Sequence, residues 1–91
     1  MQVTVEFSAQ LRVAAGASAE EIELAEGATL GDLVQRLGDV HGEPLRHLLM
    51  DDAGQLHPWL IADCNGAMRN GSTESLRDGD RIRLLSPISG G

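Results

Sequence analysis

The sequence predicts a single α+β domain in which a mixed β-sheet packs on one main helix. Three observations support this fold class. Residues 3–7 alternate between apolar and polar, as in a half-buried strand. Residues 30–37 carry a leucine-rich stripe at helical spacing, and residues 81–85 alternate again. A length of 91 residues suits one domain with one small core.

The opening of the chain predicts two neighbouring strands. The alternation of residues 3–7 indicates a strand with one buried face, and the apolar pattern continues to Leu11. Residues 13–19 are small and include a glycine, which indicates a turn. Alternation resumes over residues 21–24. We therefore expect the first two strands to form an antiparallel hairpin.

The main helix is predicted to begin after Thr29. The Thr29 hydroxyl can cap the helix, and Asp32 three residues later makes an approximate capping box. Gly38 is expected to end the helix. The apolar stripe has the spacing i, i+3, i+4, i+7 and consists of Leu30, Leu33, Val34 and Leu37.

A second, shorter helix and a β-hairpin are predicted next. Pro44 is suited to the first position of a short helix, and leucines 45, 48 and 49 would share one face of it. Residues 51–54 indicate a turn, and residues 59–64 indicate a strand. Asn65-Gly66 then predicts a tight hairpin turn into a short strand over residues 67–69.

The last part of the chain completes the sheet. We expect a turn at Asn70-Gly71, a helical turn that brings Leu76 into the core, and a tight turn at residues 78–80 before the strand 81–85. A hairpin, one helix and further strands make a β-grasp, in which a right-handed crossover brings the last strand beside the first. The β-grasp domain would cover residues 1–85.

Composition limits the classes of function. The formal net charge is −7, and all seven basic residues are arginines, so the chain contains no lysine. The acidic surface disfavours nucleic acid, and the only aromatic residues are Phe7 and Trp59, too few for base stacking. Such a surface suits either a partner with a basic face or solubility alone.

Several kinds of site are not expected. A single cysteine, Cys64, excludes an internal disulfide, a cysteine-rich zinc site and an iron–sulfur cluster. The three histidines and the aspartates near them fit no metal-ligand spacing, and no nucleophile–base arrangement is visible. No signal region or long apolar run is present. We expect a cytoplasmic protein with no membrane partner, no metal site and no bound cofactor.

Residues 86–91, with the sequence Ser-Pro-Ile-Ser-Gly-Gly, are expected to form a flexible tail. Pro87 cannot donate to a sheet ladder, so it marks the point where the last strand releases the chain. Gly90 and Gly91 lack a Cβ, which lets a partner surface approach closely. The tail would then present its terminal carboxylate to that partner, unless it is only a frayed end.

Five motifs, in this order, resemble those of one family. They are Phe7-Ser8-Ala9-Gln10-Leu11-Arg12, Ala28-Thr29-Leu30, Cys64-Asn65-Gly66, Leu76-Arg77-Asp78-Gly79-Asp80-Arg81-Ile82, and Ser86-Pro87-Ile88-Ser89-Gly90-Gly91. The sequence resembles the MoaD/ThiS family of ubiquitin-like sulfur carriers. Where the family usually has valine, Cys64 replaces it, and cysteine can act as a small apolar core residue.

The resemblance implies a carrier rather than an enzyme. In this family the carboxylate of the final glycine, here Gly91 preceded by Gly90, is adenylated by a ubiquitin-activating-like enzyme that uses ATP and magnesium. It is then converted to a thiocarboxylate that donates sulfur. Ser86, Pro87, Ile88 and Ser89 would bind the partner. Arg12 matches an arginine of the family and would hold the tail or an acidic group of the partner, unless it is an ordinary surface arginine.

The sulfur acceptor and the use of the activated end remain open. The acceptor could be the large subunit of molybdopterin synthase, a thiazole synthase or a cysteine synthase, the last served by CysO-like carriers. The chain would then be a co-substrate or the small subunit of a synthase. Alternatively, Gly91 could be conjugated to target lysines, as in a ubiquitin-like modifier. A third alternative is a non-covalent β-grasp adaptor.

Overall fold

The computed structural model describes residues 1–69 and 73–86. Within these residues the chain forms five strands and three helices. In chain order they are β1 (Gln2–Phe7), α1 (Gln10–Ala15), β2 (Ala19–Glu23), α2 (Leu30–His41), α3 (Leu45–Leu49), β3 (Ile61–Cys64), β4 (Ala67–Arg69) and β5 (Arg81–Leu85).

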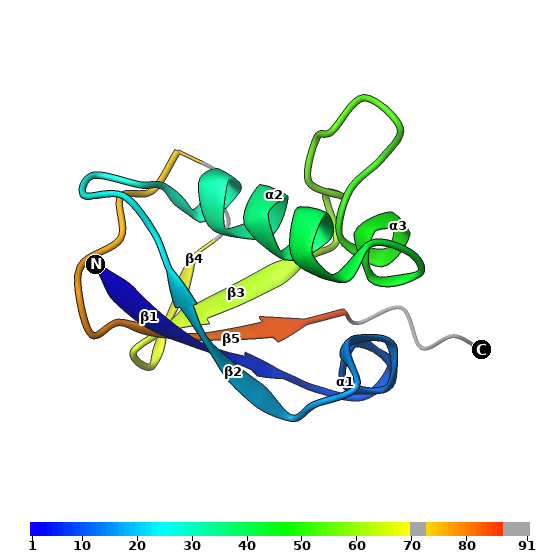
Figure 1. Cartoon of the computed structure of the whole chain (residues 1–91), viewed down its shortest axis with the longest axis horizontal. Helices are drawn as coiled ribbons and strands as arrows, with labels where there is room; N and C mark the ends of the chain where they lie inside the picture. Colours follow the sequence, from blue (N-terminus) through cyan, green and yellow to red (C-terminus); the bar gives the residue numbers. More distant parts are fainter. Residues whose placement is uncertain (70–72, 87–91) are drawn as a thin grey trace.

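The strands form one mixed sheet with the order β2-β1-β5-β3-β4 (Figure 1). β1 and β5 are parallel, whereas the other neighbouring strands are antiparallel. Ile82 of β5 lies in register with Val5 of β1 on one side and with Cys64 of β3 on the other. The predicted pairing of the last strand with the first is therefore confirmed, and β5 is the central strand.

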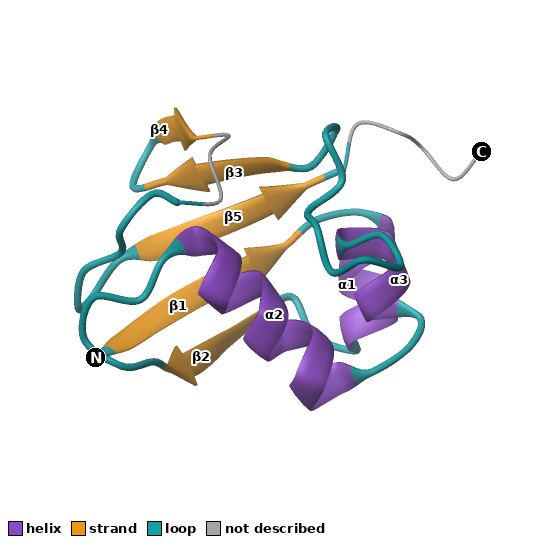
Figure 2. Cartoon of the chain, turned by 90° about the horizontal axis from the view of Figure 1, so that it is seen from above, coloured by secondary structure: helices purple, strands orange, loops and turns teal. Residues whose placement is uncertain are grey.

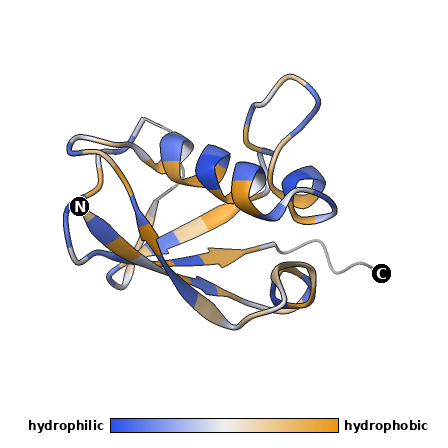
Figure 3. Ribbon diagram, viewed as in Figure 1, coloured by the Kyte–Doolittle hydropathy of each residue, from blue (hydrophilic) through white to orange (hydrophobic). Residues whose placement is uncertain are grey.

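Helix α2 covers one face of the sheet, while α1 and α3 lie together at the end of the sheet toward which β1 and β5 run (Figure 2). The side of α2 that faces the sheet is hydrophobic, and its outer side is hydrophilic (Figure 3). The core between them is aliphatic apart from Phe7. Its largest fully buried side chains are Leu11, Leu30, Leu33, Leu37, Leu45, Leu49, Met50, Ile82, Leu84, Val3, Val5 and Val34.

The predicted start of α2 is confirmed, and its predicted end is wrong. The Thr29 hydroxyl accepts a hydrogen bond from the Asp32 backbone N–H at 3.2 Å, and the Asp32 carboxylate accepts one from the Thr29 N–H at 2.9 Å. Gly38 lies inside the helix, which continues to His41. A Cβ at Gly38 would lie 2.7 Å from Cε of Met50, so the glycine leaves room for the Met50 side chain beside α2.

The region after β1 contains a helix where the sequence was expected to continue a strand and then turn. α1 buries Leu11 and ends at Gly16, which has a left-handed conformation with φ 76°. A run of alanine, glutamine, leucine and arginine before a glycine favours a helix with a glycine cap, and that signal was missed. The antiparallel pairing of β1 with β2 is nevertheless confirmed.

Two other local predictions need correction. β3 begins at Ile61, so Trp59 lies before the strand instead of in it, and its side chain is 39% exposed. Leu76 is buried as expected, but it enters the core from an extended segment whose Ser75 forms a β-bridge with Thr29, not from a helical turn. The turn predicted at Asn70-Gly71 lies outside the described residues.

Candidate functional site

The central strand β5 fixes the position of Ser86, the residue from which the C-terminal segment continues. β5 is hydrogen-bonded to a neighbour on each side and leads directly to Ser86, the last described residue. The Ser8 hydroxyl donates a hydrogen bond to the Leu84 backbone oxygen at 3.0 Å, which ties the end of β5 to the segment after β1. The residues beyond Ser86 therefore start from a well-defined point at one end of the sheet.

Two of the predicted site residues can be placed. Ser86 is half-buried at the end of β5, and Arg12 is exposed on α1. The other predicted positions lie outside the described residues, so their proposed roles stay predictions. These positions are Pro87, Ile88, Ser89, Gly90 and Gly91.

A shallow depression lies beside Ser86, where the C-terminal segment begins. It has a volume of about 190 Å³. Helix α1, helix α3, the loop before β3 and the end of β5 form its walls. The lining residues are Gln10, His47, Leu48, His57, Trp59 and Ser86, and we call this feature the Trp59 pocket. Sequence reasoning missed it because its walls come from four separate parts of the chain.

The rings of His41 and His57 have structural partners. His41 pairs with Glu20 of β2, and its ring meets Phe7 edge-on. His57 Nε2 donates a hydrogen bond to the His47 backbone oxygen at 2.8 Å. Among residues 1–69 and 73–86, no three side chains of histidine, cysteine, aspartate or glutamate are grouped so that they could hold a metal ion.

Cys64 lies on the buried face of β3, with 8% of its surface exposed. The register places it opposite Ile82 of β5. This position agrees with the prediction that the cysteine is a packing residue in the core, because a thiol in such surroundings has little contact with reagents in solution.

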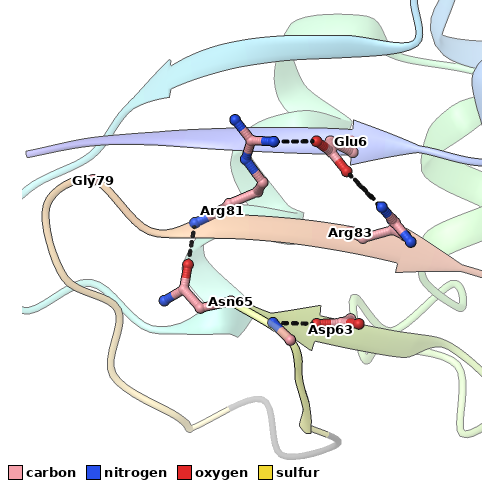
Figure 4. A pocket seen from close by; sticks show the side chains of 7 residues that line it. Glu6, Asp63, Asn65, Gly79, Arg81 and Arg83 are labelled. Atoms are coloured by element: carbon pink, nitrogen blue, oxygen red, sulfur yellow. Dashed lines mark hydrogen bonds and ion pairs between the residues drawn. The ribbon is translucent and has the colours of Figure 1, made fainter.

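The opposite face of the sheet carries charged side chains (Figure 4). Glu6 of β1 accepts from Arg81 at 3.1 Å and from Arg83 at 3.2 Å, and both arginines belong to β5. Together with Asp63, Asn65, Gly66 and Gly79, these residues line an open hollow of about 460 Å³. The face holds charges of both signs at the surface, paired across β1 and β5.

None of the helices in the described part of the chain is both long enough and apolar enough to cross a bilayer.

Residues 5–91 match the model of the ThiS family. The chain belongs to the ThiS family. The match covers nearly the whole chain, including the Gly90-Gly91 end. It confirms the resemblance that the five sequence motifs predicted.

This chain is similar to known proteins in both sequence and structure. The molybdopterin synthase sulfur carrier subunit of Chlamydomonas reinhardtii is 30% identical over 100% of both chains. Small archaeal modifier protein 1 (SAMP1) of Haloferax volcanii superposes with a TM-score of 0.89, at 26% identity and full coverage of both chains. CysO of Mycobacterium tuberculosis superposes with a TM-score of 0.70 at 26% identity, over 94% of this chain and 99% of that one.

These similarities confirm the predicted ubiquitin-like β-grasp fold. The ThiS-family chain described here also shares its overall length with the Chlamydomonas carrier subunit, since the alignment spans both from end to end. A sulfur carrier subunit and a small archaeal modifier protein are thus both among the proteins that it resembles.

Proposed function

We propose that this chain is a sulfur carrier whose Gly91 carboxylate is adenylated by a ubiquitin-activating-like enzyme and converted to a thiocarboxylate. The main support for this proposal is that the family match extends through Gly90-Gly91. In addition, a sulfur carrier subunit of the same length is similar along its whole sequence. In this role the chain is a co-substrate that supplies the reacting atom and a docking surface.

The proposed chemistry solves a specific problem. A carboxylate is a poor electrophile, because its negative charge is delocalised and its oxygen is a poor leaving group. Attack of a Gly91 oxygen on the α-phosphorus of ATP would form the acyl-adenylate and release pyrophosphate. Hydrosulfide would then attack the carbonyl carbon, forming a C–S bond while the C–O bond to AMP breaks. The partner would hold ATP and magnesium and stabilise the charge that develops.

The proposed product is itself reactive. An ionised thiocarboxylate is nucleophilic for the same reason as a thiolate. It can therefore deliver sulfur to an acceptor bound by a synthase. Relatives named for molybdopterin synthase and CysO make a synthase of molybdopterin or cysteine formation the favoured partner. We propose that the delivery takes place in the cytoplasm.

Intact mass spectrometry tests this proposal. The chain is incubated with its adenylating enzyme, ATP, magnesium and sulfide, and we expect one oxygen to be replaced by sulfur. Deletion of Gly90-Gly91 should abolish the replacement, while Met68→Ala, an exposed substitution on β4, should not. Failure of the intact chain to gain sulfur with an active enzyme would contradict the proposal. If the intact chain gains no sulfur and the deletion variant keeps the full cellular function, a non-covalent adaptor is favoured instead.

A second candidate function is protein modification, which the similarity to SAMP1 favours. The same adenylate would then be captured by a lysine of a target protein. Because these 91 residues contain no lysine, conjugates could not be extended through a lysine of the modifier. Immunoblots of cell extract should show covalent adducts that disappear when Gly91 is deleted, and their absence would exclude this function.

A further inference from the structure

We propose that the Trp59 pocket is the docking site for one apolar side chain on the rim of the adenylating enzyme's tail-binding channel. This inference rests on the proposed function, because it requires a partner that reacts with Gly91. The pocket would bind the enzyme before adenylation and would take no part in the chemistry.

Trp59 is an exposed aromatic residue in a protein whose core is mainly aliphatic. The buried core contains a single aromatic residue, Phe7, yet the only tryptophan lies at the surface with 39% of its area exposed. Tryptophan is enriched among the residues that dominate binding energy at protein interfaces. An exposed indole in an otherwise aliphatic protein is therefore a strong candidate for an interface anchor.

The indole ring is held in position before any partner arrives. It stacks on the His57 imidazole with a centroid separation of 4.3 Å and an interplanar angle of 12°. His57 is fixed in turn, because its ring donates to the His47 oxygen at 2.8 Å and its backbone N–H donates to the Leu49 oxygen at 3.1 Å. A side chain that is already ordered loses less conformational entropy on binding.

The size and lining of the pocket favour one apolar side chain. Its volume of about 190 Å³ is below the range of about 300–1,000 Å³ that is usual for small-molecule sites. None of the six lining residues is acidic, although the chain has a formal net charge of −7. The pocket therefore offers no negative charge to a lysine or arginine of the partner. An aliphatic or aromatic side chain could instead pack beside Trp59 and Leu48.

The reach of the C-terminal segment limits how far the partner can lie from the pocket. Five residues follow Ser86, and an extended chain spans at most about 3.6 Å per residue, or about 18 Å in all. An active site that adenylates Gly91 must therefore come within that distance of Ser86. Because Ser86 lines the pocket, a partner that receives Gly91 lies within reach of this part of the surface.

Steady-state ATP–pyrophosphate exchange by the adenylating enzyme tests the inference, with the intact chain as the varied substrate. Trp59→Ala should raise KM at least about tenfold and leave kcat within about twofold, because docking is lost while the reacting end is unchanged. Trp59→Phe should recover most of the loss. Gln10→Trp, which fills the pocket from α1, should also raise KM, even if Trp59→Ala is poorly folded.

Met68→Ala is the matched control, since Met68 is an exposed apolar residue on edge strand β4, away from the pocket. Its KM should equal that of the unmodified chain. The inference is overturned if Trp59→Ala and Gln10→Trp leave KM unchanged, or if Met68→Ala raises it equally. Absence of exchange with the unmodified chain would instead refute the proposed function.

Two other occupants of the pocket would also overturn the inference. If residues 87–91 of the same chain fill it, their deletion will change the fluorescence of Trp59 in the free protein. If a second copy fills it, the unmodified chain will sediment as a dimer that Trp59→Ala dissociates. We expect a monomer whose Trp59 fluorescence changes only when the adenylating enzyme is added.

Discussion

The two faces of the sheet differ sharply, and β5 shows the difference one residue at a time. Ile82 and Leu84 point into the core and have no exposed surface, whereas Arg81 and Arg83 are exposed on the opposite face. Burial of a leucine or isoleucine contributes about 1.5–3 kcal/mol, but an exposed ion pair contributes about 0.2–1 kcal/mol. The inner face therefore maintains the fold, whereas residues on the outer face can be substituted at little cost in stability.

The largest expected effect is at Leu84. Leu84→Ala should lower the free energy of unfolding by about 2–5 kcal/mol, because it leaves a cavity in the centre of the core. Urea denaturation monitored by circular dichroism measures the change. Arg83→Ala, the adjacent substitution on the outer face, should cost no more than about 1 kcal/mol. Equal losses for the two variants would contradict the proposed division between the faces.

A smaller effect is expected at Cys64, which shares the inner face. Cys64→Val should change the free energy of unfolding by less than about 1.5 kcal/mol, because both side chains are small and apolar. Thiocarboxylate formation, followed by intact mass spectrometry, should be unaffected. Loss of sulfur transfer in a variant of normal stability would show that the thiol has a chemical role and that this part of the inner face is not purely structural.

A third prediction concerns the N-terminal cap of α2, the helix that covers the inner face of the sheet. Thr29→Ala removes the hydroxyl that accepts from the Asp32 N–H, and it should cost about 1 kcal/mol. Thr29→Ser keeps the hydroxyl and should retain most of the stability. Thermal unfolding of both variants provides the measurement, and an equal decrease in Tm would mean that the methyl group, rather than the cap, is responsible.

The smallest effect is expected on the outer face itself. Glu6→Gln removes the carboxylate shared by Arg81 and Arg83, and it should cost about 0.2–1 kcal/mol at low salt. The difference should shrink in 1 M salt, where the Debye length is about 3 Å. Glu23→Gln, an exposed substitution on β2, controls for the loss of one negative charge. A cost above about 2 kcal/mol that does not depend on salt would show that this face also stabilises the fold.

Much of this architecture was predictable because its signals are local. The Thr29–Asp32 capping box, the leucine stripe of α2 and the alternation in β1 and β5 each depend on residues within one or two turns or along one strand. Asn65-Gly66 gave the hairpin between β3 and β4, and both residues have positive φ angles, 53° and 91°. The five family motifs together predicted the ThiS family and the ubiquitin-like fold.

Only the tertiary structure decided how distant segments combine. Gly38 has the sequence context of a helix end, but it lies inside α2, where the absence of a Cβ leaves room for the Met50 side chain. The sequence pattern places Trp59 in a strand. In the structure it stacks on His57 and lines the same pocket as Ser86, 27 positions away in the chain. Glu6 meets Arg83 only because β1 and β5 are neighbours in the sheet. Local patterns determine secondary structure, whereas surface pockets and ion pairs depend on contacts between residues far apart in the chain, which no local pattern encodes.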